Sequence, residues 1–160
     1  MKEMNISFNL NGKNYSFSVP TNMTLLQILR ETIGLTGTKK GCDKGDCGAC
    51  TVLFNGVTVN SCLILAPQVD SAEITTIEGI GSVDKPHPIQ KAFVEEGAVQ
   101  CGFCTPGMVV SSYSLLRKNP EPTEEEIREA LSGNLCRCTG YIKIFNAVKK
   151  ASKEEKKIGR

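Results

Sequence analysis

The chain has 160 residues, of which 40% are apolar and 22% charged, and its formal net charge at pH 7 is +2. These values are typical of a soluble globular protein with one ordinary domain or two small ones. The weak net charge argues against a nucleic-acid partner, and no apolar run approaches the roughly 18 residues of a membrane span.

The N-terminal residues predict a hairpin followed by a helix. Residues 5–19 alternate polar and apolar side chains around an Asn-Gly pair at 11–12, which is a strong hairpin signal. Residues 24–34 predict a helix, because Thr24 and Gln27 have the spacing of a capping box and apolar residues recur on one face.

A second hairpin and a last strand complete the first half of the chain. Residues 50–62 turn at the Asn-Gly pair 55–56, and residues 73–79 predict a strand. The order of hairpin, helix, loop, hairpin and strand suits a small mixed sheet crossed by one helix. We therefore expect a β-grasp domain, of the plant-type ferredoxin kind, at residues 1–80.

The second half of the chain has helical periodicity after a linker at residues 79–88. We expect a helical domain at residues 81–160, arranged as a small four-helix bundle, and hence an α+β protein. The four predicted helices cover residues 89–97, 106–119, 124–133 and 141–153.

Eight cysteines are an unusual number for such a chain. The N-terminus does not resemble a signal peptide, so we expect a cytoplasmic location, where disulfides are rare. The chain is also long enough to form cores without disulfides. Two sets of four cysteines predict two metal sites. The first set is Cys42, Cys47, Cys50 and Cys62, and the second is Cys101, Cys104, Cys136 and Cys138.

The first set begins C-x4-C-x2-C, the spacing of a plant-type [2Fe–2S] site. Cys62 follows sooner than the fourth ligand usually does, but the second hairpin carries it directly back. A four-thiolate cluster is anionic and needs backbone N–H groups aimed at its sulfurs. Gly41, Gly45 and Gly48 would let the loop wrap around such a cluster without a hindering Cβ.

The second set joins Cys101-x2-Cys104 to Cys136-x-Cys138 and leaves the metal open. Structural zinc also takes four thiolates, although C-x-C is less usual in zinc sites than C-x2-C. Placement before predicted helices favours an anionic cluster, because helix N-termini attract negative charge. A Rieske centre needs two histidines, whereas this chain has only His87, between prolines of the linker.

Three motifs, GCDKGDCGACTV, QCGFCTPGM and GNLCRCTGY, occur in this order along the chain. They resemble the small iron–sulfur subunit of the molybdenum hydroxylases. This family includes xanthine dehydrogenase, aldehyde oxidoreductase, carbon monoxide dehydrogenase and 4-hydroxybenzoyl-CoA reductase. The resemblance covers residues 4–150 and all eight cysteine positions.

This resemblance implies one [2Fe–2S] cluster on each set of four cysteines. It also implies a large partner subunit that carries molybdopterin, as the cytosine dinucleotide, near the second cluster. A medium subunit carrying FAD would face the first cluster, in a dimer of heterotrimers. Gln100 and the region of Cys138 would contact the pterin.

By the same resemblance, this chain is the electron-transfer subunit of an oxidoreductase and performs no substrate chemistry itself. In the family, a molybdenum centre hydroxylates the substrate with oxygen from water, and electrons leave singly through the clusters to flavin. In the CoA reductase branch this flow reverses. We expect a purine or another heteroaromatic substrate, with aromatic CoA thioesters, aldehydes and CO as alternatives.

The residues themselves also lack a catalytic motif. No G-x-G-x-x-G opens a helix after a strand, and the carboxylates of Glu124, Glu125 and Glu126 suit the first turn of a helix. Two other functions stay open at this point, a free ferredoxin-like electron carrier and a zinc module without a redox role. Co-purification with larger chains would separate the first from a subunit, and metal analysis would identify the second.

Overall fold

The N-terminal hairpin forms where the alternating residues predict it. The computed structural model, which describes residues 2–157, pairs β1 (Glu3–Leu10) with β2 (Lys13–Pro20) in antiparallel orientation. The turn residues Asn11 and Gly12 have φ of 52° and 80°, as a two-residue turn between right-twisted strands requires. Every second side chain of β1 from Ile6 onward is buried, so one face of the hairpin belongs to the core.

The sheet has five strands in the order β2-β1-β5-β3-β4. The second predicted hairpin is present as β3 (Thr51–Phe54) and β4 (Val57–Asn60). The central strand β5 (Glu73–Thr75) pairs parallel with β1 and antiparallel with β3. The strand predicted at residues 73–79 is therefore shorter than expected, and its last part forms the short helix α3 (Ile77–Ile80).

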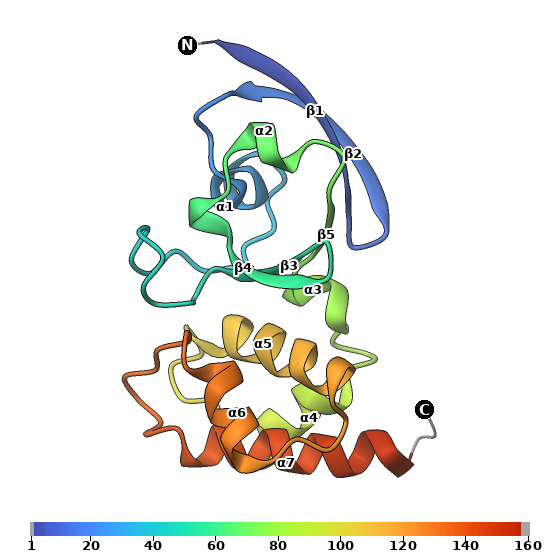
Figure 1. Cartoon of the computed structure of the whole chain (residues 1–160), viewed down its shortest axis with the longest axis vertical. Helices are drawn as coiled ribbons and strands as arrows, with labels where there is room; N and C mark the ends of the chain where they lie inside the picture. The colour runs from blue at the N-terminus through green and yellow to red at the C-terminus, as the bar shows by residue number, and fades with distance from the viewer. Residues whose placement is uncertain (1, 158–160) are drawn as a thin grey trace.

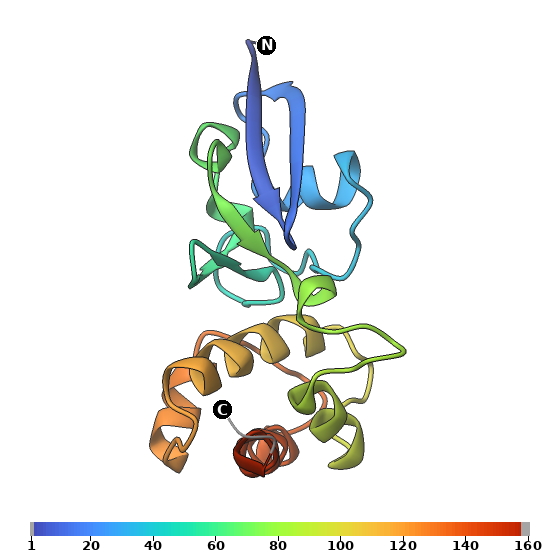
Figure 2. The ribbon, with the colours of Figure 1, turned by 90° about the vertical axis from the view of Figure 1, so that its right-hand side faces the viewer.

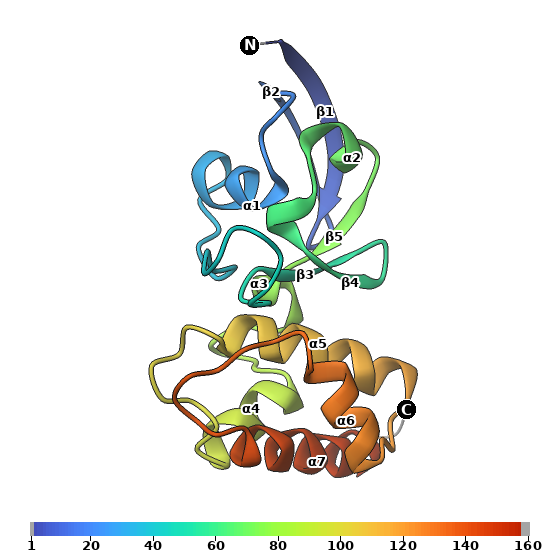
Figure 3. The ribbon, with the colours of Figure 1, turned by 60° about the vertical axis from the view of Figure 1, so that its left-hand side comes forward.

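The predicted first helix is present but irregular. It begins as α1 (Leu25–Gln27) and continues as the π-helical segment η1 (Ile28–Thr32). The capping box of Thr24 and Gln27 is formed, with both hydrogen bonds in place. The buried side chains of this helix join those of β1, β3 and β5 in the core of the sheet (Figure 3).

Two short helical segments between β4 and β5 had no sequence signal. Residues Ser61–Leu63 form the 3-10 turn η2, and residues Ala66–Val69 form α2. The backbone N–H of Leu25 donates to the carbonyl of Ile64, at 2.7 Å, which ties this segment to the start of the first helix. The result is a ferredoxin-like sheet domain of the β-grasp kind.

The four helices predicted for the second half of the chain are confirmed, with small shifts at their ends. The helix α5 lies against the sheet, and the other three helices lie beyond it (Figure 1). The connection from α3 to α4 runs along the side of the molecule (Figure 2). The helices are α4 (Pro88–Glu95), α5 (Thr105–Lys118), α6 (Glu124–Leu131) and α7 (Ile142–Lys157).

Each half has its own hydrophobic core. The helical core is built around the fully buried side chains of Phe93, Met108 and Ile127. Leu53 of β3 also belongs to this core, because β3 packs against α5. The protein is therefore α+β, with a sheet domain and a helical domain in direct contact. None of the helices in residues 2–157 combines the length and apolarity that crossing a membrane requires.

A buried asparagine joins the two halves. The Asn134 side-chain amide donates to the carbonyl of Gly48, at 2.9 Å, and to the hydroxyl of Thr51, at 3.1 Å. Its oxygen accepts a hydrogen bond from the Ser111 hydroxyl at 2.7 Å. One side chain therefore links the loop before α7 both to α5 and to the cysteine-rich loop of the sheet domain.

The backbones of the two halves also approach closely at this point. The N–H of Leu135 donates to the carbonyl of Cys47 at 2.9 Å. A Cβ on Gly48 would collide with the carbonyl oxygen of Gly133, and a Cβ on Gly107 would collide with the carbonyl oxygen of Gly48. Glycine at 48 and 107 is what allows this distance, and the positive φ of Gly48 (67°) adds a second reason at that position.

We predict that Asn134→Ala destabilises the protein by about 1–3 kcal/mol, because it leaves buried polar groups of both halves without partners. The free energy of unfolding from urea titration measures this change. Asn14→Ala is the matched control, since Asn14 is exposed and bonds only its neighbour Asn9 across the hairpin. Equal effects of the two substitutions would contradict the role given to Asn134.

A surface ion pair predicts a pH dependence of stability. Hydrogen bonds from Lys149 (2.5 Å) and Arg128 (2.6 Å) lower the pKa of Glu124 from 4.5 to about 2. A lowered pKa in the folded state stabilises the protein above pH 4.5, and this contribution is lost as the pH falls toward 2. Glu124→Gln should therefore lower the melting temperature slightly at pH 7, with a difference that closes near pH 2.

Glu125→Gln provides the control for this pH dependence. Glu125 lies on the same exposed first turn of α6 and makes no ion pair with any residue in 2–157. It removes the same charge without breaking a contact. A melting-temperature difference between the two variants that is independent of pH would refute the assigned pairing.

Candidate metal centres

The first cysteine set is assembled by a loop and a hairpin. Cys42 and Cys47 lie in the loop between the first helix and β3, and Cys50 directly precedes β3. The antiparallel β3–β4 hairpin returns the chain to Cys62 in η2, as expected from the sequence. The backbone N–H and the hydroxyl of Ser61 both donate to the Cys50 carbonyl, at 3.2 and 2.8 Å, which fixes this return.

The sulfur of Cys42 lies in a concave array of backbone donors. The N–H groups of Lys44, Asp46 and Cys47 point at it, at 3.5, 3.3 and 3.4 Å. These donors, that of Lys44 first, lower the pKa of the Cys42 thiol to about 7. Because the thiolate is the form that binds metal, the loop is preorganised for a negatively charged sulfur ligand.

The glycines of this loop lie where side chains would interfere. A Cβ on Gly41 would lie 2.7 Å from the sulfur of Cys47, and one on Gly45 would lie 2.6 Å from a methyl carbon of Leu63. The side chains of Asp43, Lys44 and Asp46 point to solvent, as predicted. The loop therefore closes around the sulfurs with its charged groups outside.

The second cysteine set lies at one end of the helical domain. Cys104 is the N-cap residue of α5, and Cys136 and Cys138 lie in the loop that leads to α7. The two loops meet at the same end of the domain (Figures 1 and 3). The sulfurs of Cys101 and Cys138 are 3.5 Å apart, although the residues are far apart in sequence.

Burial separates the inner thiols from the outer ones. Desolvation, followed by contact with the Cys50 thiol, raises the pKa of Cys62 to about 12. Desolvation and the Cys136 thiol raise the pKa of Cys104 to about 12 in the same way. Cys101 and Cys138 are exposed. A metal at either site must displace protons from the buried thiols, so metal binding there depends on pH.

In both sets the thiols come together as pairs. The contacting pairs are Cys42 with Cys47, Cys50 with Cys62, Cys101 with Cys138 and Cys104 with Cys136. Within residues 2–157, no three Cys, His, Asp or Glu side chains converge on one ion position. A single tetrahedral zinc needs four ligands around one ion, whereas a diiron centre with four thiolates places two on each iron. The observed pairs fit the diiron centre.

The remaining predicted residues have distinct environments. Gln100 and Cys138 are both exposed at the end of the helical domain that carries the second set, and their contact with a pterin stays a prediction. His87 caps α4, since its Nδ1 accepts the N–H of Ile89 at 3.3 Å, and its ring packs edge-on against Tyr113. It is a structural residue, as expected, and lies away from the cysteines.

The structure adds one contact to sulfur that the sequence did not reveal. The hydroxyl of Thr139 lies 3.1 Å from the sulfur of Cys136, and the Thr139 backbone N–H lies 3.4 Å from the same atom. A threonine directly after C-x-C was the available signal, but many threonines near cysteines face elsewhere.

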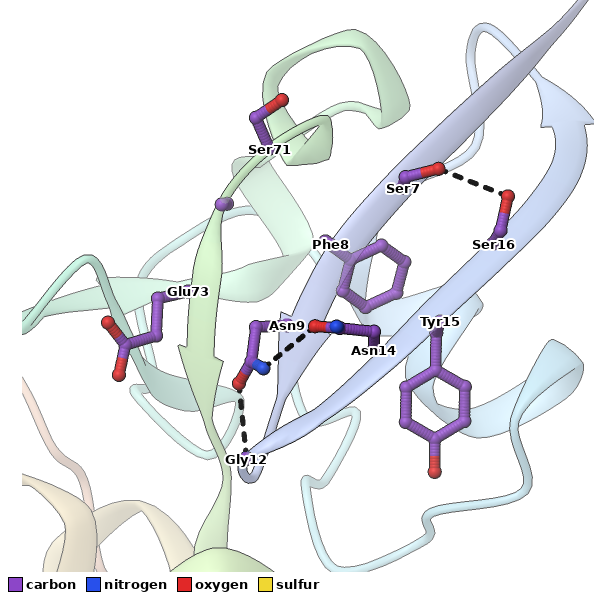
Figure 4. A pocket seen from close by; sticks show the side chains of 10 residues that line it. Ser7, Phe8, Asn9, Gly12, Asn14, Tyr15, Ser16, Ser71 and Glu73 are labelled. Atoms are coloured by element: carbon purple, nitrogen blue, oxygen red, sulfur yellow. Dashed lines mark hydrogen bonds between the residues drawn. The ribbon is translucent and has the colours of Figure 1, made fainter.

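The surface also carries a polar depression of about 820 Å³ beside the N-terminal hairpin (Figure 4). The side chains of Ser7 and Ser16 bond each other there, as do those of Asn9 and Asn14. Glu73 is the single ionisable residue of its lining. Because its polar groups satisfy one another and no cysteine lies in it, this depression does not compete with the thiols as the functional site.

Family models match both halves of the chain. Residues 8–75 match the model of a 2Fe-2S iron-sulfur cluster binding domain, and residues 76–149 match that of a [2Fe-2S] binding domain. The two models together cover most of the chain. The protein therefore has two [2Fe–2S]-binding domains, each with its own set of cysteines.

Known proteins are similar to this chain over nearly its full length. The small FeS subunit of nicotinate dehydrogenase from Eubacterium barkeri is 54% identical, over 94% of this chain and 96% of the relative. The iron-sulfur-binding subunit of the Escherichia coli K12 aldehyde oxidoreductase is 47% identical, over 96% of this chain and 73% of the relative.

A solved structure of quinoline 2-oxidoreductase from Pseudomonas putida 86 contains a similar chain. It superposes with a TM-score of 0.93 at 46% identity, and the match covers 99% of both chains. Fold, cysteine arrangement and sequence thus lead to the same family. The chain belongs to the small [2Fe–2S] subunits of the molybdenum hydroxylases, which are iron–sulfur electron-transfer subunits of multi-subunit oxidoreductases.

Proposed function

We propose that this chain transfers single electrons between a molybdenum centre and a flavin, both of which are held by partner subunits. The observation that carries the proposal is the grouping of each cysteine set into two thiol pairs, which fits two diiron centres. When bound, a [2Fe–2S] cluster supplies a site that accepts and releases one electron. The first set of four cysteines would hold one cluster and the second set the other.

The residues between the two sets support transfer within the chain. Cys47 of the first set accepts a hydrogen bond through its carbonyl from Leu135, the neighbour of Cys136 in the second set. This single hydrogen bond connects the backbones of two proposed ligands. Asn134 holds it in place from the buried side. The chain thereby fixes the relative position of the two sets without a mobile linker between them.

The carboxylates support a role without substrate chemistry. Glu124 is paired with Lys149 and Arg128, and Glu126 is bonded to the N–H and hydroxyl of Thr123 in a capping box. These groups are engaged in structure and face no acid–base partner in a pocket. We infer that hydroxylation takes place on the molybdenum subunit.

The partners follow from the same proposal. A large subunit carrying molybdopterin, as its cytosine dinucleotide, would cover the exposed end of the helical domain with Gln100 and Cys138. A medium subunit carrying FAD would face the first set, in a dimer of heterotrimers without nucleic acid. The free state of all eight cysteines supports a reducing, cytoplasmic location. We place the division between the two domains at residues 80 and 81, where α3 ends.

We propose an N-heteroaromatic compound as the substrate of the assembled enzyme. Nicotinate dehydrogenase (54%) and the small subunit of nicotine 6-hydroxylase from Paenarthrobacter nicotinovorans (50%) are both more similar to this chain than the aldehyde oxidoreductase subunit (47%). An aldehyde is the second candidate.

Metal content and EPR test the ligand assignment. Anaerobically purified protein should contain about four irons per chain and, after reduction with dithionite, show two distinct rhombic signals. Cys62→Ser should abolish one signal and about half of the iron, and Cys104→Ser should abolish the other signal. Zinc in place of iron, or one variant removing both signals, would refute two separate clusters on these residues.

Turnover by the intact complex tests the substrate class. With an artificial electron acceptor, kcat/KM for nicotinate should exceed that for benzaldehyde by at least about tenfold, because the two classes bind differently in the transition state. The complex that carries Cys104→Ser is the control, since it retains the molybdenum subunit but lacks an electron exit. A preference for benzaldehyde would favour the aldehyde alternative.

A further inference from the structure

The two cysteine sets differ in the donors that reach their sulfurs. In the first set, Cys42 accepts hydrogen bonds from backbone N–H groups alone, as described above. In the second set, Cys136 accepts one backbone N–H, from Thr139 at 3.4 Å, and also the Thr139 hydroxyl at 3.1 Å. No other hydroxyl lies within hydrogen-bond distance of a cysteine sulfur among residues 2–157.

The neighbouring contacts determine where the hydroxyl proton of Thr139 points. The backbone N–H of Tyr141 donates to the Thr139 hydroxyl oxygen at 3.3 Å. This contact occupies a lone pair of the oxygen and leaves its own proton for an acceptor on the other side. The sulfur of Cys136 is that acceptor. The Thr139 hydroxyl is therefore a donor to sulfur and not an acceptor from it.

Tyr141 holds this arrangement rigidly. Its phenol oxygen accepts the backbone N–H of Cys136 at 2.9 Å, and its ring stacks on Phe145 of α7 with centroids 6.3 Å apart. Its backbone has φ of 70°, which is uncommon for a residue with a side chain. The loop from Cys136 to Tyr141 is thus closed at both ends, and the hydroxyl of Thr139 is fixed within it.

We propose that the Thr139 hydroxyl is a positioning residue that raises the reduction potential of the cluster on the second cysteine set. The inference rests on the proposed function. Reduction adds one electron to the cluster and no proton leaves Thr139. A donor to sulfur stabilises the more negative reduced state more than the oxidised state, so it favours reduction.

The environment of this contact preserves its strength. Cys136 and Thr139 are both half-buried, so water competes less for the sulfur than it would at the exposed Cys101 and Cys138. Burial by itself raises the pKa of Cys136, but the hydroxyl and N–H of Thr139 outweigh it and the pKa is lowered. The same two donors therefore already favour negative charge on this sulfur in the thiol form.

The test is a redox titration of the assembled holoenzyme, followed by EPR of both clusters. Thr139→Val keeps the shape of the side chain and removes the hydroxyl. We expect it to shift the reduction equilibrium of the second cluster about tenfold toward the oxidised form, which is about 59 mV for a one-electron couple. The first cluster should keep its potential and serves as the internal reference.

Two matched variants control this experiment. Thr139→Ser retains the hydroxyl and should keep the potential of the second cluster. Thr105→Val makes the same chemical change beside Cys104, where no hydroxyl contact to sulfur is present, and should also leave the potential unchanged. An equal shift in Thr105→Val and Thr139→Val, or no shift in Thr139→Val, overturns the inference.

The outcomes also separate this inference from the proposed function. Absence of iron or of both EPR signals in the unaltered protein refutes the proposed function itself. Two normal signals without a shift in Thr139→Val refute only the role of Thr139. If neither Thr139→Val nor Thr139→Ala retains the second cluster while Thr139→Ser does, the hydroxyl is needed for assembly, and the tuning role is rejected.

Discussion

The close contact between the two cysteine-bearing loops is the constraint on which the rest of the structure depends. Asn134 is buried and bonded to both halves, and the backbones around it approach so closely that residues 48 and 107 must be glycine. Buried polar groups are costly unless they are satisfied, so these contacts form together or not at all. The ferredoxin-like sheet and the helices therefore act as one rigid support for two metal centres.

This rigidity suits electron transfer between fixed sites. A protein that only shuttles electrons between enzymes needs one small fold and one cluster. Here a second domain, with its own core, presents a second set of thiols against the first. The hydrogen bond between Leu135 and Cys47 lies directly between the two sets. The free-carrier and zinc-module alternatives both leave this junction without a purpose.

The immediate surroundings of the sulfurs are shaped by dipoles and not by formal charges. The charged residues of the first loop form exposed pairs, Lys40 with Asp43 and Lys44 with Asp46, and such pairs contribute little because water screens them. Backbone N–H groups, one helix N-terminus and the hydroxyl of Thr139 are the groups that point at sulfur. Fixed dipoles stabilise negative charge without placing a competing ion in the site.

The sequence by itself determined the hairpins, the capped helices and the two sets of cysteines, because turn residues, caps and ligand spacing are local signals. It did not determine the π-helical segment after Gln27, the helix α3 or the pairing of the thiols. Asn134 and Gly48 are 86 residues apart, and no local pattern indicates that they meet. Only the tertiary structure decided which donors reach which sulfur, because that depends on how two separate cores pack against each other.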